Sequence, residues 1–371
     1  MQAMSRRAPT SQAGFTLVEI MVGLAIGMLA MVIIIQVISV FEAQRRTTAG
    51  TADAQTNGGI ALFNIGRELQ LAGYPLVPVT ASPLECATLS INGAADATVP
   101  NRLSPVAIVD DVVGAGVNAS PSDTLTLRYG TGGMGGVPTQ PLTTYIASAA
   151  QGPVSLKSTF GCNEGDMALI TSGTSCDLTS VRGPTTDPVG PAPTLTEITL
   201  ANIPSATTES NLACMGTWTE VTYGVDNGNL VRTVVNNFGA GSTNPVVAGI
   251  VNLQVQYGVS ATANSNEVTQ WVDASGGTWG APTVANRNRI KSLRIAVVAR
   301  NAKTEPSVVT SACSSINTPA PTGLCAWEGS ALSPAPTIDL SAGDPNWGRY
   351  RYRVFETIIP LRNMIWSKDT L

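Results

Sequence analysis

The pattern of apolar and polar positions begins with one long apolar segment. Residues 20–35 contain no charged or polar side chain, and after Gln36 the apolar pattern continues to Phe41. A helix needs about 20 apolar residues to cross the hydrocarbon core of a membrane. Residues 15–41 therefore predict a membrane-spanning helix that carries one acid, Glu19, near its start.

Helical spacing of apolar residues continues beyond this span. The stripe consists of Leu62, Ile65, Leu69 and Ala72. Arg67 and Glu68 lie off this stripe, which could pack on a sheet. Residues 47–59 have poor helix propensity, so a bend or local melting is expected there. Gly73 and Pro75 then end the helix, which gives a transmembrane half, residues 15–41, and a second half, residues 42–75, on the periplasmic side.

Short segments with strand-like patterns follow the helix. The expected strands are residues 123–129, 250–259, 290–298 and 349–359, together with a hairpin over residues 218–235. Leu125, Leu127 and Tyr129 share one face of the first strand. The hairpin turns at Asn227-Gly228, a strong turn signal. One long helix followed by strands predicts an α+β fold with a large antiparallel β-rich globular head over residues 76–371.

Composition supports a chain with many turns. The 371 residues include 36 glycines and 24 prolines, and only 12% are charged. Such a composition suits short strands joined by many turns. Residues 80–217 read as long loops or an inserted β subdomain within the head.

The chain lacks the residue patterns of common enzymes. It contains no histidine, which excludes Ser-His-Asp and Cys-His catalytic arrangements and imidazole metal sites. Asp110 and Asp111 are adjacent, and adjacent strand residues point to opposite faces, so this pair is not expected to converge. Residues 130–135 satisfy GxGxxG, but Pro138 and Pro141 favour a loop over the helix that a nucleotide site needs. We expect no enzyme activity, no metal and no cofactor.

Six cysteines follow the membrane span. They are Cys86, Cys162, Cys176, Cys214, Cys313 and Cys325. No two of them form a CxxC, and export past the membrane favours disulfides. The shortest loops suggest Cys162 with Cys176 and Cys313 with Cys325, which leaves Cys86 with Cys214. The alternative is that one or two of them are free buried thiols.

The residues before the apolar segment differ from a secretory signal peptide. Arg6 and Arg7 are followed by a small polar stretch and Gly14, and only then by the apolar segment. A cut that removed this leader would leave the helix on the mature chain. The stretch GFTLVE, residues 14–19, resembles the class III leader of type IV prepilins and type II secretion pseudopilins.

The resemblance implies a pilin-like fold, a processing event and a role for Glu19. Residues 1–14 would be the leader, a prepilin peptidase would cut between Gly14 and Phe15, and Phe15 would be N-methylated. Glu19 would neutralise the α-amino group of a neighbouring subunit during assembly. An acid within a membrane is costly unless it is paired, which agrees with such a role. The alternative is that Glu19 sits unpaired at the depth of the lipid headgroups.

Four later segments narrow the resemblance. VTYGVDNGNLVR, VAGIVNLQVQYGV, SLRIAVVAR and RYRVFETIIPLRN, within residues 218–363, resemble the PilW family of minor type IV pilins. This family implies a structural subunit of pilus assembly in a priming or tip complex, anchored in the inner membrane before assembly and exposed on the cell surface afterwards. It implies other minor pilins, the major pilin and a tip adhesin as partners. The alternative is a J-type minor pseudopilin, which is normally much shorter.

Charge is distributed unevenly along the head. Residues 81–280 carry 5 basic and 15 acidic side chains, whereas residues 281–371 carry 11 basic and 6 acidic ones. Arg349, Arg351 and Arg353 alternate along an expected strand, so they predict a basic contact face. Such a face is solvated, contacts an acidic neighbour, or binds DNA phosphates in a DNA-binding pilin.

Overall fold

The computed structural model describes residues 14–76, 86–98, 102–113, 120–134, 136–183 and 196–365. The chain divides into two compact units, residues 1–50 and residues 51–371. Helix α1 (Leu17–Leu69) continues without interruption from the first unit into the second. Residues 47–59 are helical, so the predicted local melting is wrong.

The first unit presents an exposed apolar helix. The large apolar side chains from Leu17 to Phe41 are all at least 47% exposed. In the part of the chain that the structure describes, α1 is the one helix long and apolar enough to cross a membrane. Its exposed apolar surface requires either lipid or other apolar helices around it.

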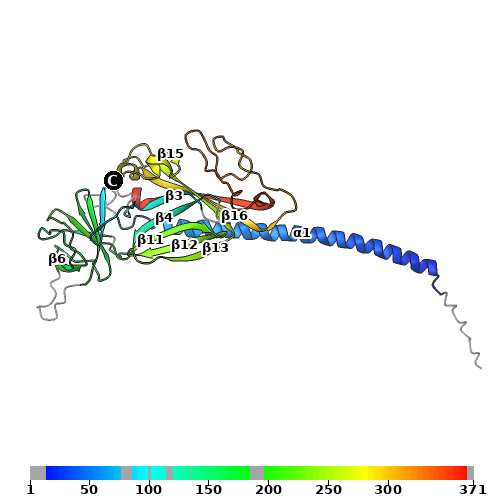
Figure 1. The fold of residues 1–371 in the computed structure, drawn as a ribbon, viewed down its shortest axis with the longest axis horizontal. Helices are drawn as coiled ribbons and strands as arrows, with labels where there is room; N and C mark the ends of the chain where they lie inside the picture. Colours follow the sequence, from blue (N-terminus) through cyan, green and yellow to red (C-terminus); the bar gives the residue numbers. More distant parts are fainter. Residues whose placement is uncertain are drawn as a thin grey trace, which may run out of the picture. The chain divides into compact units, whose positions relative to one another are not determined.

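The second unit contains two sheets that share a core with the end of α1 (Figure 1). The first sheet has the strand order β13-β12-β11-β4-β3. Its strands are β3 (Val106–Val112), β4 (Ser122–Gly130), β11 (Trp218–Asp226), β12 (Asn229–Asn236) and β13 (Ser242–Ala248). The second sheet has the order β15-β14-β16-β17. Its strands are β14 (Ile250–Ser260), β15 (Val268–Val272), β16 (Ile290–Thr304) and β17 (Tyr350–Pro360).

These two sheets are antiparallel throughout, and the predicted α+β fold is confirmed. The hairpin forms as expected, because Asp226 pairs with Asn229 across a turn in which Asn227 and Gly228 both have positive φ. Each of the other expected strands is present within one to six residues of its predicted bounds. The largest difference is β16, which extends to Thr304.

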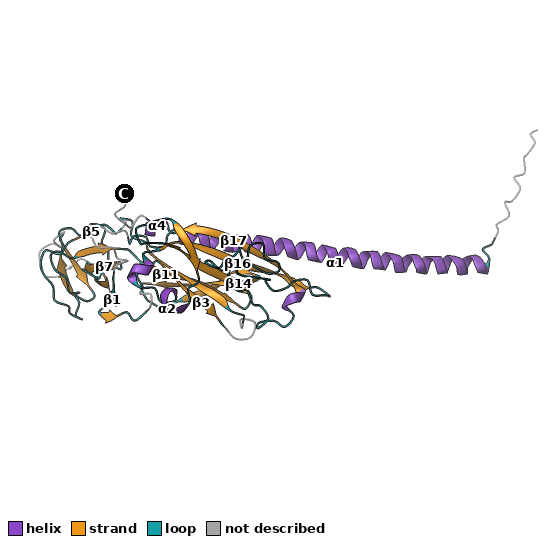
Figure 2. Ribbon diagram, turned by 90° about the horizontal axis from the view of Figure 1, so that it is seen from above, coloured by secondary structure: helices purple, strands orange, loops and turns teal. Residues whose placement is uncertain are grey.

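A further group of strands lies beside these sheets (Figure 2). A six-stranded sheet has the order β2-β1-β8-β7-β10-β5, and β6 pairs with β9. The strands are β1 (Thr88–Ile91), β2 (Ala94–Ala95), β5 (Pro138–Thr139), β6 (Gly152–Ser155), β7 (Met167–Ser172), β8 (Ser175–Ser180), β9 (Glu197–Leu200) and β10 (Asn211–Cys214). Residues 80–217 are therefore not one inserted block, because β3 and β4 belong to the five-stranded sheet. Most of residues 182–197, expected as loop, lie outside the described residues.

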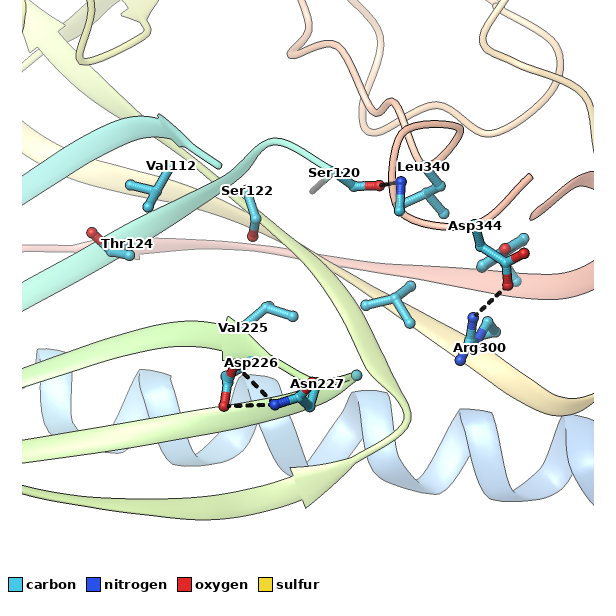
Figure 3. Close-up of a pocket in the computed structure, with 14 residues that line it drawn as sticks. Val112, Ser120, Ser122, Thr124, Val225, Asp226, Asn227, Arg300, Leu340 and Asp344 are labelled. Carbon is cyan, nitrogen blue, oxygen red and sulfur yellow. Dashed lines mark hydrogen bonds and ion pairs between the residues drawn. The ribbon is translucent and has the colours of Figure 1, made fainter. Parts of the chain in front are cut away.

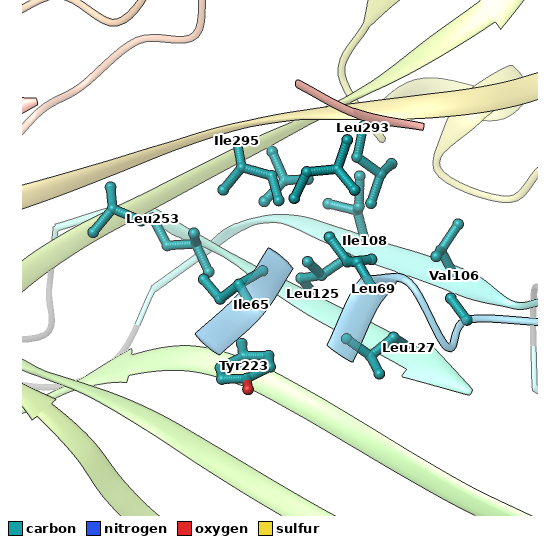
Figure 4. Close-up of a cluster of buried hydrophobic side chains, with 14 of the residues drawn as sticks. Ile65, Leu69, Val106, Ile108, Leu125, Leu127, Tyr223, Leu253, Leu293 and Ile295 are labelled. Atoms are coloured by element: carbon teal, nitrogen blue, oxygen red, sulfur yellow. The ribbon is translucent and has the colours of Figure 1, made fainter. Parts of the chain in front are cut away.

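The main core forms where α1 meets both sheets (Figure 4). Ile65, Leu69 and Ala72 of the predicted stripe are buried, and Leu62 is half-buried against the same cluster. Leu125 and Leu127 of β4 and Leu253 of β14 complete the contact from the two sheets. Because this core uses one face of α1, its other face remains in solvent with Ile60 and Phe63 exposed.

The segment between β16 and β17 covers the opposite face of the second sheet. Leu324, Ile338 and Leu340 from this segment pack on Ala296 and Val298 of β16. Short helical turns complete the described fold: α2 (Gly276–Trp279), α3 (Val284–Arg287), the 3₁₀ turn Trp347–Arg349 and α4 (Arg362–Ile365). The two central strands of this sheet, β14 and β16, are thereby almost continuously buried, whereas the edge strands β15 and β17 are partly exposed.

Candidate functional site

The predicted cleavage site lies immediately before the first turn of α1. Gly14 and Phe15 precede the helix, and Phe15 is 81% exposed. Thr16 and Glu19 close the first turn, because Glu19 N–H donates to Thr16 Oγ1 at 3.3 Å and Thr16 N–H donates to Glu19 Oε2 at 3.4 Å. This reciprocal pair is a capping box. Residues 1–13 lie outside the described residues.

Glu68 joins α1 to the first sheet through a buried ion pair that the sequence analysis missed. Its carboxylate accepts a hydrogen bond from Tyr223 Oη at 2.8 Å and from Arg232 Nε at 3.0 Å, and it also pairs with Arg232 Nη2. Glu68 is only 7% exposed. Burial, and then the hydrogen bond to Glu68, raise the pKa of Tyr223, and the hydrogen bond to Glu68 raises the pKa of Arg232.

The spacing of Glu68 could have revealed this position. Glu68 follows Ile65 by three residues and precedes Ala72 by four, which places all three on one helix face. Arg67 is exposed, so only one of the two charged residues lies away from the core. The pair connects this turn of α1 to β11 and β12, and loss of Arg232 would leave the Glu68 carboxylate buried without its cation.

All six cysteines form disulfides, and two of the three bonds differ from the shortest-loop pairing. The bonds join Cys86 to Cys176, Cys162 to Cys214 and Cys313 to Cys325. Only the last has the expected partners, and the alternative of free thiols is wrong.

Strand pairing explains the two corrected disulfides. β1 pairs in parallel with β8, with Leu89 opposite Cys176, and this brings Cys86 near that strand. Cys214 lies on β10, and Cys162 packs against the same cluster of buried side chains. A parallel pair needs a long connection, so short sequence separation was the wrong guide.

The three arginines do not form one continuous face. Arg349 lies in the 3₁₀ turn before β17 and donates through Nη2 to the carbonyl of Pro306 at 3.0 Å. Arg351 pairs through Nε with Glu305 at 2.7 Å. Arg351 and Arg353 remain two residues apart on β17 and therefore share one side of the strand.

Two cavities lie close to this part of the second sheet. One, of about 180 Å³, is lined by Arg351, Arg353 and residues of α1 and β16. The other, of about 210 Å³, lies between the turn of the β11–β12 hairpin and the segment before β17 (Figure 3). In its wall Arg300 pairs with Asp344 at 3.4 Å. Asp226 also lines this cavity, so Arg300 has an acidic partner and a second acid nearby.

Asp110 and Asp111 converge, contrary to expectation. A bulge in β3 and a positive φ at Asp111 place both carboxylates near Asp123, with oxygen atoms of the three within 4.8 Å of one another. Asp123 is 1% exposed and accepts the backbone N–H groups of Asp111 and Val255. Burial raises the pKa of Asp123 to about 8 and that of Asp110 to about 6. Acidic clusters of this kind are common without a bound ion, so we assign none here.

Two family models match parts of the chain. Residues 216–363 match the family described as type IV pilus-assembly protein W, and residues 9–35 match the prokaryotic N-terminal methylation motif. Among solved structures, a type IV-like pilin from Thermus thermophilus is similar at 16% identity and a TM-score of 0.21, over 54% of this chain and 86% of that one. No curated protein sequence gives a significant match.

Proposed function

We propose that this chain, a member of the PilW family of type IV pilins, is a minor pilin of the priming or tip complex of a type IV pilus. Its family membership points to a structural, non-enzymatic protein. The proposal concerns how the chain enters the pilus and which groups carry that step. The methylation motif over residues 9–35 contains the predicted cleavage site and Glu19 in fixed register.

The first step is processing at the inner membrane. Prepilin peptidase cuts between Gly14 and Phe15, and Phe15 is then N-methylated. The local geometry supports this step, because both residues are exposed and precede the helix. The cut therefore removes no helical residue and leaves the capping pair of Thr16 and Glu19 in place.

The second step is helix packing among pilin subunits. The head lies in the periplasm before assembly, and the apolar helix moves from lipid into contact with the helices of other minor pilins, the major pilin and a tip subcomplex that includes an adhesin. Glu19 pairs there with the α-amino group of a neighbour, since an acid among apolar helices needs a partner. The observation that carries this proposal is the register of the motif on a helix whose apolar side chains are all exposed from Leu17 to Phe41.

The proposal is tested by replacing Glu19→Gln in the full chain. We expect the amount of this chain in sheared pili to fall by about tenfold, because the uncharged side chain cannot neutralise the neighbour's amine. Asp53→Asn on the exposed face of α1 is the matched control and is expected to leave incorporation unchanged. Quantitative mass spectrometry of pili and membranes measures both.

The same samples report on processing. The intact mass in membranes is expected to correspond to a chain that begins at methylated Phe15. An uncut chain, or normal incorporation of the Glu19→Gln variant, would contradict the proposal.

A further inference from the structure

The 180 Å³ cavity is formed where β17 packs beside α1. Phe355 of β17 lies against Gly58 of α1, where an added Cβ would overlap the ring. Because side chains alternate along a strand, Arg351 and Arg353 share the α1 side of β17 with Phe355. The residues that line the cavity are Thr51, Ala54, Asn301, Val309, Thr310, Arg351, Tyr352 and Arg353.

The charges around this cavity do not balance. Arg351 is paired with Glu305 at 2.7 Å. The side chain of Arg353 is exposed and has no hydrogen bond or ion pair with any other described residue. No acidic residue is among the described residues that line the cavity, and their other polar side chains carry a hydroxyl or an amide. One guanidinium therefore borders the cavity without a counter-charge among the described residues, unlike Arg300 in the neighbouring cavity.

We propose that this cavity receives a carboxylate side chain of a neighbouring pilin subunit, held by Arg353. This inference rests on the proposed function. A guanidinium presents two parallel N–H donors that match a carboxylate, and partial enclosure strengthens the pair. The neighbour is a pilin because Thr51 and Ala54 belong to the helix that mediates assembly, ten and thirteen residues beyond Phe41.

The same geometry disfavours DNA as the occupant. A nucleic-acid strand presents phosphates at regular intervals, and binding requires several cations to meet them. Arg349 donates to the Pro306 carbonyl, and Arg351 pairs with Glu305. Of the three arginines, only Arg353 therefore has a guanidinium without a partner among the described residues. One open guanidinium fits one carboxylate.

The test compares three variants of the full chain in cells that assemble pili. Arg353→Glu is expected to lower the amount of this chain in sheared pili by about tenfold, because a repulsive charge replaces the attraction. Arg353→Lys keeps the positive charge and is expected to retain most of the incorporation. Arg349→Glu, outside the cavity, is the matched control and is expected to match the wild type.

A cross-linking experiment identifies the occupant without relying on a loss of assembly. Val309→p-benzoylphenylalanine places a photoreactive group in the cavity wall of an otherwise unchanged chain. We expect irradiation of intact pili to join it to a pilin peptide that contains Asp or Glu. The membrane level and the disulfide map of each variant confirm that the chain is folded.

Three results would overturn the inference. The first is incorporation of Arg353→Glu at the wild-type level, and the second is a cross-linked peptide that contains no acidic residue. The third is that Arg353→Glu loses binding to a fluorescent duplex DNA oligonucleotide while its incorporation stays normal. The proposed function fails separately, through Glu19→Gln. If Glu19→Gln blocks incorporation and Arg353→Glu does not, the minor-pilin role stands and the carboxylate cavity is wrong.

Discussion

Buried acids are stabilised in two different ways in the globular unit. Glu68 remains next to a cation, because Arg232 and Tyr223 both donate to it. Asp123 has two backbone N–H donors, while the nearby charged groups are the carboxylates of Asp110 and Asp111. Desolvation outweighs the two hydrogen bonds and raises its pKa to about 8. Asp123 therefore carries a pH dependence of stability.

We predict that stability decreases from pH 5 to pH 8 because of Asp123. Its folded-state pKa lies above the ordinary value of 3.8, so the folded chain binds more protons than the unfolded chain between these values. Its contribution is complete below pH 3.8 and is lost as the pH rises through about 8. Asp123→Asn, which cannot ionise, is expected to flatten this decrease.

Urea unfolding of the detergent-solubilised chain, followed by tryptophan fluorescence across this pH range, measures the effect. The slope of stability against pH is the readout, since the substitution also alters the hydrogen bonds to Asp111 and Val255. Glu209→Gln, an exposed acid, serves as the control. An unchanged slope in Asp123→Asn would show that this carboxyl does not titrate as described.

At the scale of elements, packing overrides the local propensity of α1. Residues 47–59 contain Gly58 and Gly59, which disfavour a helix in isolation. Gly58 is nevertheless buried, because the ring of Phe355 occupies the space that a side chain would take. Gly59 is exposed, and a Cβ added there would meet no atom within 4 Å. Gly59 therefore shows only the entropic cost of glycine in a helix, whereas Gly58 is required for close packing against Phe355.

Substitution to alanine is expected to act in opposite directions at these two positions. Gly59→Ala should stabilise the chain by about 1 kcal/mol, because alanine favours the helix and meets no neighbour. Gly58→Ala should destabilise it by about 1–3 kcal/mol through overlap with the Phe355 ring. Chemical unfolding of both variants measures the difference, and Phe355→Leu is expected to relieve part of the loss in Gly58→Ala. Equal effects at the two positions would contradict the packing.

Local sequence signals predicted the elements that depend on nearby residues. Asn227-Gly228 fixed the expected hairpin, and the apolar stripe located Ile65 and Leu69 in the core. Features that depend on distant segments were not predictable in this way. The bulge in β3 brings the carboxylates of Asp110 and Asp111 to the same side of the strand. It depends on the pairing of β3 with β4, so the alternation of a regular strand does not predict it.

The candidate site was predictable to a similar degree. The positions of Gly14, Phe15 and Glu19 follow from a motif of contiguous residues, and their roles remain proposals. The partner of Glu68 lies 164 positions away on β12, so no local pattern identifies it. Arg349 does not share the face of Arg351 and Arg353, because it lies in the 3₁₀ turn that precedes β17.

At the scale of the whole molecule, the two compact units differ in what holds them together. Residues 17–41 expose all their apolar side chains, whereas the described residues of the second unit include several buried apolar clusters and three disulfides. Two of these bonds each join a strand to a loop residue that is distant in sequence, Cys176 to Cys86 and Cys214 to Cys162. Their sequence separations are 90 and 52 residues, against 12 for the third bond.

We predict that the longer loops contribute more stability. Replacing both Cys86 and Cys176 with alanine is expected to cost about 2 kcal/mol more than replacing both Cys313 and Cys325, from the logarithmic dependence of loop entropy on length. Chemical unfolding of the two double variants measures this difference. Peptide mapping without reduction should find these pairings in the wild type, and a peptide that joins Cys162 to Cys176 would refute the disulfide arrangement.

The contact of Glu68 with β11 and β12 has a mechanical consequence. A force along the axis of α1 would slide the helix past both strands. This movement would break the hydrogen bonds that Tyr223 and Arg232 donate to the Glu68 carboxylate. Separating these partly buried groups costs free energy, because the Glu68 carboxylate is only 7% exposed and would lose its charged partner. The helix therefore resists being pulled out of the globular unit, and this resistance is concentrated at the turn that contains Glu68.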